Sequence, residues 1–179
     1  MNPNTGDICF FKDRSKTLET IKRAEAAGFK AIIVSVEVAA LGLRLNEYHN
    51  NFKLPPGVTN METWLKGILN PDDVGLAIQH AVDEILVSNH RGRQLDGVPA
   101  TLDALRECAP VTKNKIKLAV DGGIRRGSDI FKAIALGADF CFAGRPPLWG
   151  LAYNGAEGVD LSVKILLREF RTSIALCGC

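Results

Sequence analysis

The sequence lacks several features that would place it in a common functional class. Its 22 basic and 20 acidic residues give a net charge of only +2, which favours neither nucleic acid nor an anionic membrane as a partner. No apolar run approaches the length of a transmembrane helix, and the polar start Met1–Asn4 is unlike a secretory signal. The ending Leu176–Cys179 is not a peroxisomal address, so we expect an intracellular protein, cytoplasmic or organellar.

Cysteine occurs five times but never with the CxxC spacing of many metal sites. Cys177 and Cys179 form a terminal pair that is too sparse to hold a metal without further ligands, so we expect no metal. The odd number of cysteines fits a reducing compartment. With 46% hydrophobic and 23% charged residues over 179 positions, the composition is that of one soluble globular domain.

Apolar runs alternate with amphipathic segments along most of the chain. Strands are expected at residues 8–11, 31–36, 64–69, 84–87, 116–120 and 140–143. Helices are expected at about 15–27, 70–81, 101–108, 128–136 (capped by Ser128) and 160–175. This alternation predicts a parallel α/β sheet that right-handed crossovers curl toward a barrel. The segment from Val38 to Thr63 shows no convincing helix, and the run 64–69 after it is poorly bounded.

A histidine and an arginine lie three positions apart where a buried strand opens into a loop. His90 and Arg93 belong to the decapeptide Ser88–Gly97, which follows the apolar run Glu84–Val87. A histidine can take a proton near neutral pH, and the planar guanidinium of arginine matches a carboxylate. The pair therefore suggests a site that deprotonates a small acid held by its carboxylate. A buried structural histidine beside a solvated arginine is the alternative that these residues alone leave open.

Two later strand ends carry glycines next to arginines. The run 116–120 leads into Asp121–Gly127, and the run 140–143 leads into Gly144–Arg145–Pro146. Glycines let backbone N–H groups approach an anion, and arginine neutralises it. In a βα barrel the loops after the last two strands often form a phosphate site. Either turn alone is explained as well by solvated arginines, but two in consecutive units favour a phosphate-bearing cofactor.

In this order and spacing, the three segments resemble the FMN-dependent 2-hydroxy acid dehydrogenases and oxidases, which include glycolate oxidase, lactate oxidase and the flavin domain of flavocytochrome b2. The resemblance runs from Cys9 onward and is strongest from Lys66 to Gly150. It implies a TIM (β/α)8-type barrel, here incomplete with roughly strands 3 to 8, in a single partial domain over residues 1–179. The implied reaction is FMN-dependent oxidation of a small (S)-2-hydroxy acid to a 2-keto acid, with oxygen or another electron acceptor.

The resemblance also implies roles for individual residues. His90 would be the catalytic base, and Arg44 and Arg93 would bind the substrate carboxylate. The residues implied to contact the flavin are Ser35, Lys66 and Ser88, of which the lysine would stabilise a reduced, anionic ring. The residues implied to hold the ribityl chain and phosphate are Asp121, Gly122, Gly123, Ile124, Arg125, Gly144 and Arg145.

The chain departs from the family pattern at several points. The family's first two strand–helix units have no counterpart in this chain, since residues 8–11 resemble the family's third strand. Asp7, Phe11 and Glu37 replace a glutamine, a tyrosine and an aspartate of the family. Arg91 replaces a glycine beside His90. An open six-strand sheet would expose two edges and part of its apolar interior, which self-association would cover. The alternative is therefore a catalytically inactive remnant or incomplete gene product of this family that retains FMN or phosphate binding. A third reading is another phosphate-binding βα enzyme, such as an isomerase.

Overall fold

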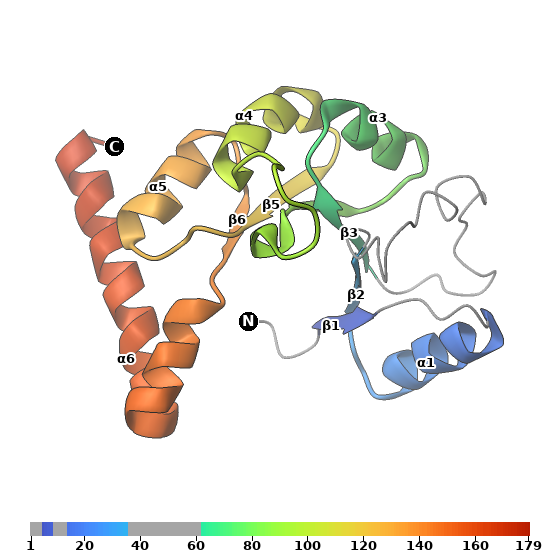
Figure 1. The fold of residues 1–179 in the computed structure, drawn as a ribbon, viewed down its shortest axis with the longest axis horizontal. Coiled ribbons are helices and arrows are strands. Elements are labelled where there is room, and N and C mark those ends of the chain that lie inside the picture. The colour runs from blue at the N-terminus through green and yellow to red at the C-terminus, as the bar shows by residue number, and fades with distance from the viewer. Residues whose placement is uncertain (1–4, 9–13, 36–61) are drawn as a thin grey trace.

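A computed structural model describes residues 5–8, 14–35 and 62–179 (Figure 1). Six parallel strands form one sheet, in which every strand pairs with the next one along the chain. They are β1 (Thr5–Ile8), β2 (Ala31–Ser35), β3 (Glu62–Ile68), β4 (Glu84–Val87), β5 (Lys117–Asp121) and β6 (Phe140–Phe142). This sequential order confirms the α/β class and is that of a barrel wall, since a doubly wound sheet reverses its strand order.

Helices connect the strands and cover one side of the sheet. They are α1 (Arg14–Ala26), α3 (Pro71–Gln79), α4 (Thr101–Thr112), α5 (Gly127–Ala135) and α6 (Arg145–Cys177), with the short helical turn η1 (His90–Gly92) after β4. In Figure 1, α3, α4 and α5 form an arc along the outer side of the strands. None of the helices in the described ranges is long and apolar enough to cross a membrane.

The main hydrophobic core lies between the sheet and helices α3 to α5. Ile85 and Val87 of β4 and Leu118 and Val120 of β5 are almost completely buried in it. The helices contribute the buried side chains Val74, Ala77, Ala104, Leu105, Cys108 and Ala133. Because successive strand residues point to opposite faces, the residues between these positions face the inner side of the curved sheet.

Aromatic contacts on that inner side show how strongly the sheet is curved. The ring of Trp64 on β3 lies 6.3 Å from that of Phe140 and 5.7 Å from that of Phe142, both on β6. In a flat sheet, three strand spacings of about 4.8 Å each would separate β3 from β6. The sheet is therefore curved as a barrel wall is, which places the ends of β3 to β6 around a common centre.

Several predicted boundaries were wrong, each for a local physical reason. The poorly bounded run 64–69 is a well-formed strand that pairs with both neighbours, and a bulge at Gly67 interrupts its register. Helix α5 is capped at Arg126 and not at Ser128, because the Asp129 carboxylate accepts hydrogen bonds from the backbone N–H groups of Arg125 and Arg126. The first strand begins earlier than predicted, and residues 9–11 of that prediction lie outside the described residues, as does most of the segment 38–63.

Helices α4 and α6 are longer than predicted. Helix α4 continues to Thr112 through Pro110, and α6 begins at Arg145 rather than near residue 160. Non-helical backbone at Asn154 and Gly155 breaks α6 into two arms. The prolines that follow Gly144 were a signal for the earlier start, since proline is favoured in the first turn of a helix.

Candidate active site

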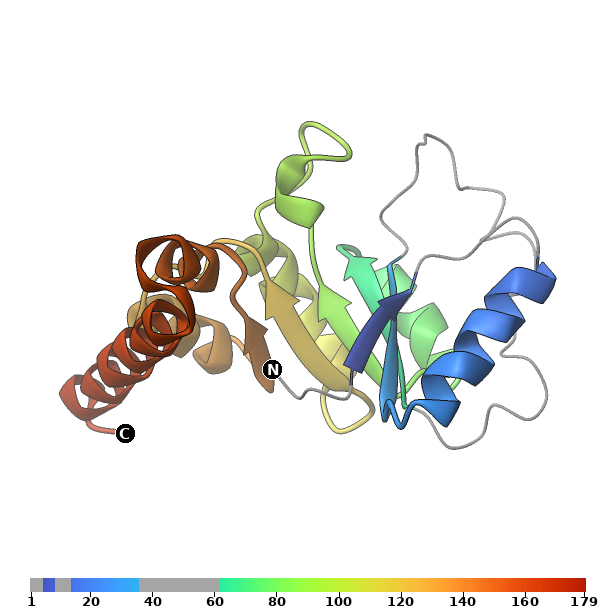
Figure 2. The same cartoon turned by 90° about the horizontal axis from the view of Figure 1, so that it is seen from below.

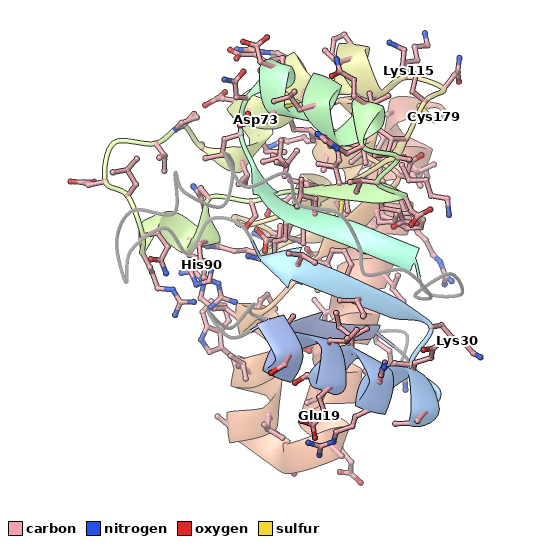
Figure 3. All side chains as sticks on the ribbon, turned by 90° about the vertical axis from the view of Figure 1, so that its right-hand side faces the viewer. Glu19, Lys30, Asp73, His90, Lys115 and Cys179 are labelled. Carbon is pink, nitrogen blue, oxygen red and sulfur yellow. The ribbon has the colours of Figure 1, made fainter. Side chains whose placement is uncertain are left out.

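The predicted site residues gather at the carboxyl ends of strands β3 to β6. Lys66 lies near the end of β3, His90 follows β4, Asp121 ends β5, and Gly144 follows β6. In a parallel sheet these ends meet at one edge, where barrel enzymes carry their active sites. Figure 2 shows η1 and the loop after it projecting beyond the strand ends, and Figure 3 shows nitrogen-bearing side chains gathered around His90.

Two basic side chains contact the ring of His90. The Nζ atom of Lys66 lies 3.4 Å from Nδ1, and the Nη2 atom of Arg93 lies 3.2 Å from Nε2. A neutral imidazole offers one acceptor nitrogen and one N–H, so in either tautomer only one of these contacts can use His90 as the acceptor. The arrangement brings together the three side chains that the sequence assigned to base, substrate and flavin.

The backbone around His90 is held in an unusual turn. His90, Arg91 and Gly92 have φ angles of 50°, 62° and 68°, three consecutive residues in the left-handed region. For residues other than glycine this conformation costs about 1–2 kcal/mol each. The turn is closed by a 2.8 Å hydrogen bond from the Gly92 N–H to the Asn89 carbonyl. Strain of this kind is concentrated at functional sites, where surrounding contacts maintain it.

The side chain of Ser88 stabilises this turn. It is completely buried, and its Oγ atom accepts a 3.2 Å hydrogen bond from the backbone N–H of His90. The side chain therefore helps to set the position of the imidazole. Its predicted flavin contact stays a prediction.

An acidic group lies on the inner side of the same edge. The Oδ2 atom of Asp121 is 4.0 Å from Nζ of Lys66, which links β5 to β3 across β4. The other carboxylate oxygen, Oδ1, is buried and accepts no hydrogen bond from any residue in the described ranges. A buried acceptor of this kind calls for a donor, and a hydroxyl-bearing ligand at the strand ends would supply one.

The turn after Asp121 contains two glycines, whose lack of side chains lets a ligand approach the backbone closely. Gly122 and Gly123 have φ angles of 85° and 75°, which glycine adopts without strain. The Thr101 hydroxyl donates a 3.2 Å hydrogen bond to the Gly122 carbonyl, and a Cβ atom at Gly122 would lie 3.1 Å from that hydroxyl oxygen. The side chain of Ile124 is buried in the main core, so only its backbone is placed to face a ligand. Thr101 holds this turn, and no sequence signal pointed to it.

The predicted phosphate-binding arginines lie on the loops after β5 and β6. Arg125 is exposed, and it lines a groove of about 280 Å³ together with Pro146 and Trp149. Arg145 is half-buried in the first turn of α6, directly after Gly144. Pro146 and Pro147 have no backbone N–H, so the anion-binding groups here are the guanidinium groups of Arg125 and Arg145. This part of the site therefore suits a phosphate group.

The structure does not place every predicted residue. Arg44 lies outside the described residues, as do Phe11 and Glu37. Ser35 ends β2 next to Lys66 of β3 in register, but its side chain is not described. Arg91 was given no role in the site from the sequence. It was noted only as a departure from a pattern, whereas its guanidinium lies directly against Gly144.

The described part of the site is strongly positive. Its basic side chains are Lys66, Arg91, Arg93, Arg125 and Arg145. Asp121 is the acidic residue among the described side chains assigned to it. Such an edge attracts anionic ligands, and both a phosphate and a carboxylate fit the donors present.

Comparison with known proteins identifies the kind of molecule that has this arrangement. A family model described as FMN-dependent dehydrogenase matches residues 2–63 and 57–179. Oxidase FUB9 of Gibberella fujikuroi is 45% identical over 193 residues, which cover 94% of this chain and 54% of the relative. Human 2-Hydroxyacid oxidase 1 is 40% identical, with 96% of this chain and 59% of the relative covered. L-lactate oxidase of a Nostoc species is 38% identical, with 94% and 58% covered.

Solved structures confirm the fold expected from the sequence. A mandelate oxidase variant carrying an FMN adduct superposes with a TM-score of 0.86 at 35% identity, covering 98% of this chain and 60% of that one. These neighbours are flavin oxidases of the TIM-barrel type, so the fold is an incomplete barrel. The chain thus spans little more than half the length of the relatives it matches. The 193-residue alignment is longer than this chain, so FUB9 also has residues within the matched region that lack a counterpart here.

Proposed function

The chain belongs to the FMN-dependent dehydrogenase family, and we propose that it binds FMN at the carboxyl ends of β3 to β6 and oxidises a small (S)-2-hydroxy acid to a 2-keto acid. The observation that carries this proposal is the contact of His90 with both Lys66 and Arg93, next to Asp121. We take residues 1–179 to be a single partial domain of this family.

The residues present suit FMN. The buried Oδ1 atom of Asp121 would accept a hydrogen bond from a ribityl hydroxyl, and the Gly122–Gly123 turn leaves room for the chain to approach. The phosphate would lie near the guanidinium groups of Arg125 and Arg145, on the loops after β5 and β6. When bound, FMN supplies the acceptor for the two electrons that leave the substrate.

The protein's own part in the reaction is to orient the acid and to move a proton. Arg93 would bind the substrate carboxylate through its guanidinium, and a small acid held there lies next to the imidazole of His90. His90 would accept the substrate's proton at the ring nitrogen that carries no hydrogen. Lys66 would favour negative charge on a neighbouring group.

A second candidate function is FMN or phosphate binding without turnover. The observation that favours it is that, among the described strands, β1 pairs only with β2 and β6 only with β5, so neither edge is closed. Association of two copies would shield such edges, and sedimentation measures it directly. We further propose that either oxygen or another molecule accepts the electrons from the reduced flavin.

Formation of a 2-keto acid tests the proposal. The purified chain would be saturated with FMN and given glycolate, lactate, mandelate and a long-chain 2-hydroxy acid, either in air or with an artificial electron acceptor under nitrogen. We expect 2-keto acid from at least one substrate and none from the His90→Gln variant. Bound FMN with no product from any acid or acceptor would support the second candidate. Failure to retain FMN would exclude the oxidation and would leave, of the second candidate, only the binding of phosphate.

A further inference from the structure

Arg91 occupies a position that its backbone conformation does not favour. It lies in η1 between His90 and Gly92 with φ 62° and ψ 27°, in the left-handed region that glycine adopts most easily. Its side chain is exposed and contributes nothing to the hydrophobic core. Neither packing nor backbone preference explains an arginine here, which points to a role for the guanidinium.

The guanidinium of Arg91 reaches across the edge of the sheet to the loop after β6. A Cβ atom built on Gly144 would collide with Nη2 of Arg91, and it would lie 3.2 Å from Cζ. The side chain thus spans from the turn after β4 to the residue that precedes α6. The absence of a side chain at Gly144 is what allows this approach.

The side chains of Arg91 and Arg93, two positions apart, therefore contact different parts of the site. Arg93 contacts the His90 ring, where a carboxylate would bind, whereas Arg91 lies against Gly144, beside Arg145 and the first turn of α6. The Arg91 guanidinium has no ion pair with any acidic residue in the described ranges. Its five N–H donors are suited to a phosphate.

We propose that Arg91 is a phosphate-binding residue of the cofactor site, which acts together with Arg145. This inference rests on the proposed function, because the phosphate in question is that of FMN. It adds a cation to the site from a loop that the phosphate-binding turns after β5 and β6 do not include. A phosphate dianion gains more from such an added cation than a neutral ribityl chain does.

The test compares FMN with riboflavin, which has the same ring and ribityl chain but no phosphate. Dissociation constants would be measured by flavin fluorescence for the wild type, Arg91→Gln and Arg91→Gly, with Arg106→Gln as a control that removes an exposed arginine from α4. We expect both Arg91 variants to bind FMN roughly tenfold more weakly or worse and to bind riboflavin within twofold of the wild type. Arg106→Gln should change neither constant.

Arg91→Gly adds a second, independent readout. Glycine relieves the left-handed strain, so this variant should melt at a higher temperature than the wild type without ligand, even though it binds FMN more weakly. Unchanged FMN affinity in both variants would overturn the inference and leave the proposed function intact. An equal loss of FMN and riboflavin affinity would also overturn it, because Arg91 would then only shape the turn.

If the protein binds no flavin, the role of Arg91 can still be tested with inorganic phosphate. Binding of inorganic phosphate would then be followed by ³¹P line broadening in the wild type and in Arg91→Gln. Broadening that only the wild type produces would support a phosphate site at Arg91 while the proposed function fails. Equal broadening, or none, would overturn both.

Discussion

The Nη2 atom of Arg93 lies 3.2 Å from Nε2 of His90, within a single turn that Ser88 and Asn89 hold in place. The proposed base and the proposed anchor for the substrate carboxylate therefore lie on one short segment of backbone. Arg93 contacts Nε2 of the ring, whereas Lys66 of β3 contacts Nδ1, so each ring nitrogen has its own basic neighbour. Substitutions at the two positions should consequently separate binding from proton transfer.

Arg93→Lys keeps the positive charge but removes the planar pair of donors that matches a carboxylate. We expect the KM for the 2-hydroxy acid to rise roughly tenfold or more, while the dissociation constant for FMN stays unchanged. Steady-state kinetics and a flavin titration measure the two quantities. Arg106→Lys on the exposed side of α4 is the matched control, and an unchanged KM in Arg93→Lys would remove Arg93 from the substrate site.

Glu169 fastens α6 to the start of α5. It accepts a 3.0 Å hydrogen bond from Nη2 of Arg126 and a 2.9 Å hydrogen bond from the backbone N–H of Gly127. The Arg126 side chain, and then the Gly127 N–H, hold the pKa of this carboxyl below its ordinary value of 4.5. A carboxyl whose pKa is lower in the folded state stabilises the fold above its ordinary pKa, and this stability is lost as the pH falls through the lowered value.

Glu169→Gln should therefore lower the melting temperature at neutral pH, and the difference from the wild type should shrink once the pH falls below 4.5. Melting curves recorded across the acid range measure this difference. The control is Glu107→Gln, which removes an exposed carboxylate from α4. A difference that is constant with pH would mean that the ionised carboxylate is not what stabilises this contact.

Gly127 lies at a close contact between α5 and α6. A Cβ atom there would collide with the backbone of Glu169 and Phe170. We expect Gly127→Ala to destabilise the fold by about 1–3 kcal/mol, as overpacking does, measured by chemical denaturation. Gly75→Ala in α3 is the control, because no described atom lies within 4 Å of the added methyl group and its φ is not positive. That variant should be neutral or stabilise by up to about 1 kcal/mol, and equal effects at both sites would contradict the α5–α6 packing.

The cysteines should differ sharply in reactivity. Burial raises the pKa of both the Cys108 and the Cys141 thiols to about 11, with a further contribution from Glu107 at Cys108. Because the thiolate is the reactive form, iodoacetamide at about pH 8 should label the exposed Cys177 and Cys179 well before these two. Peptide mass spectrometry of the native and urea-unfolded protein measures the rates, and rapid native labelling of Cys108 would show that the main core is open.

Much of the fold could be predicted from the sequence, because the signals for it are local. Apolar runs such as Glu84–Val87 and caps such as Asn70 mark strand and helix ends wherever they occur. The break in α6 could not be predicted, because it depends on Asn154 and Gly155 reversing a helix whose two arms then pack through Gly150 and Gly158. The 62–68 strand was underestimated for a similar reason, since pairing with both neighbours defines it and its own composition does not.

The candidate site was likewise predictable only in part. His90, Arg93, Lys66 and Asp121 were predicted from their segments, and the structure brings all four to one edge of the sheet. The reach of Arg91 to Gly144 could not be predicted, because it joins two loops 53 positions apart through the curvature of the sheet. The burial of the Ser88 and Ile124 side chains was also beyond the sequence, since it depends on which face of the turn meets the core.

The central claim is that this chain retains flavin chemistry with His90 as the base, and the reduction of bound flavin in a single turnover tests it most directly. FMN-loaded wild type, His90→Gln and the control His80→Gln, an exposed position after α3, would be mixed without oxygen with the acids given above. We expect at least one acid to bleach the visible flavin band in the wild type and in His80→Gln, and to do so at least about 100-fold more slowly in His90→Gln. Bound flavin that no acid bleaches, or equal bleaching rates in all three proteins, would contradict the account.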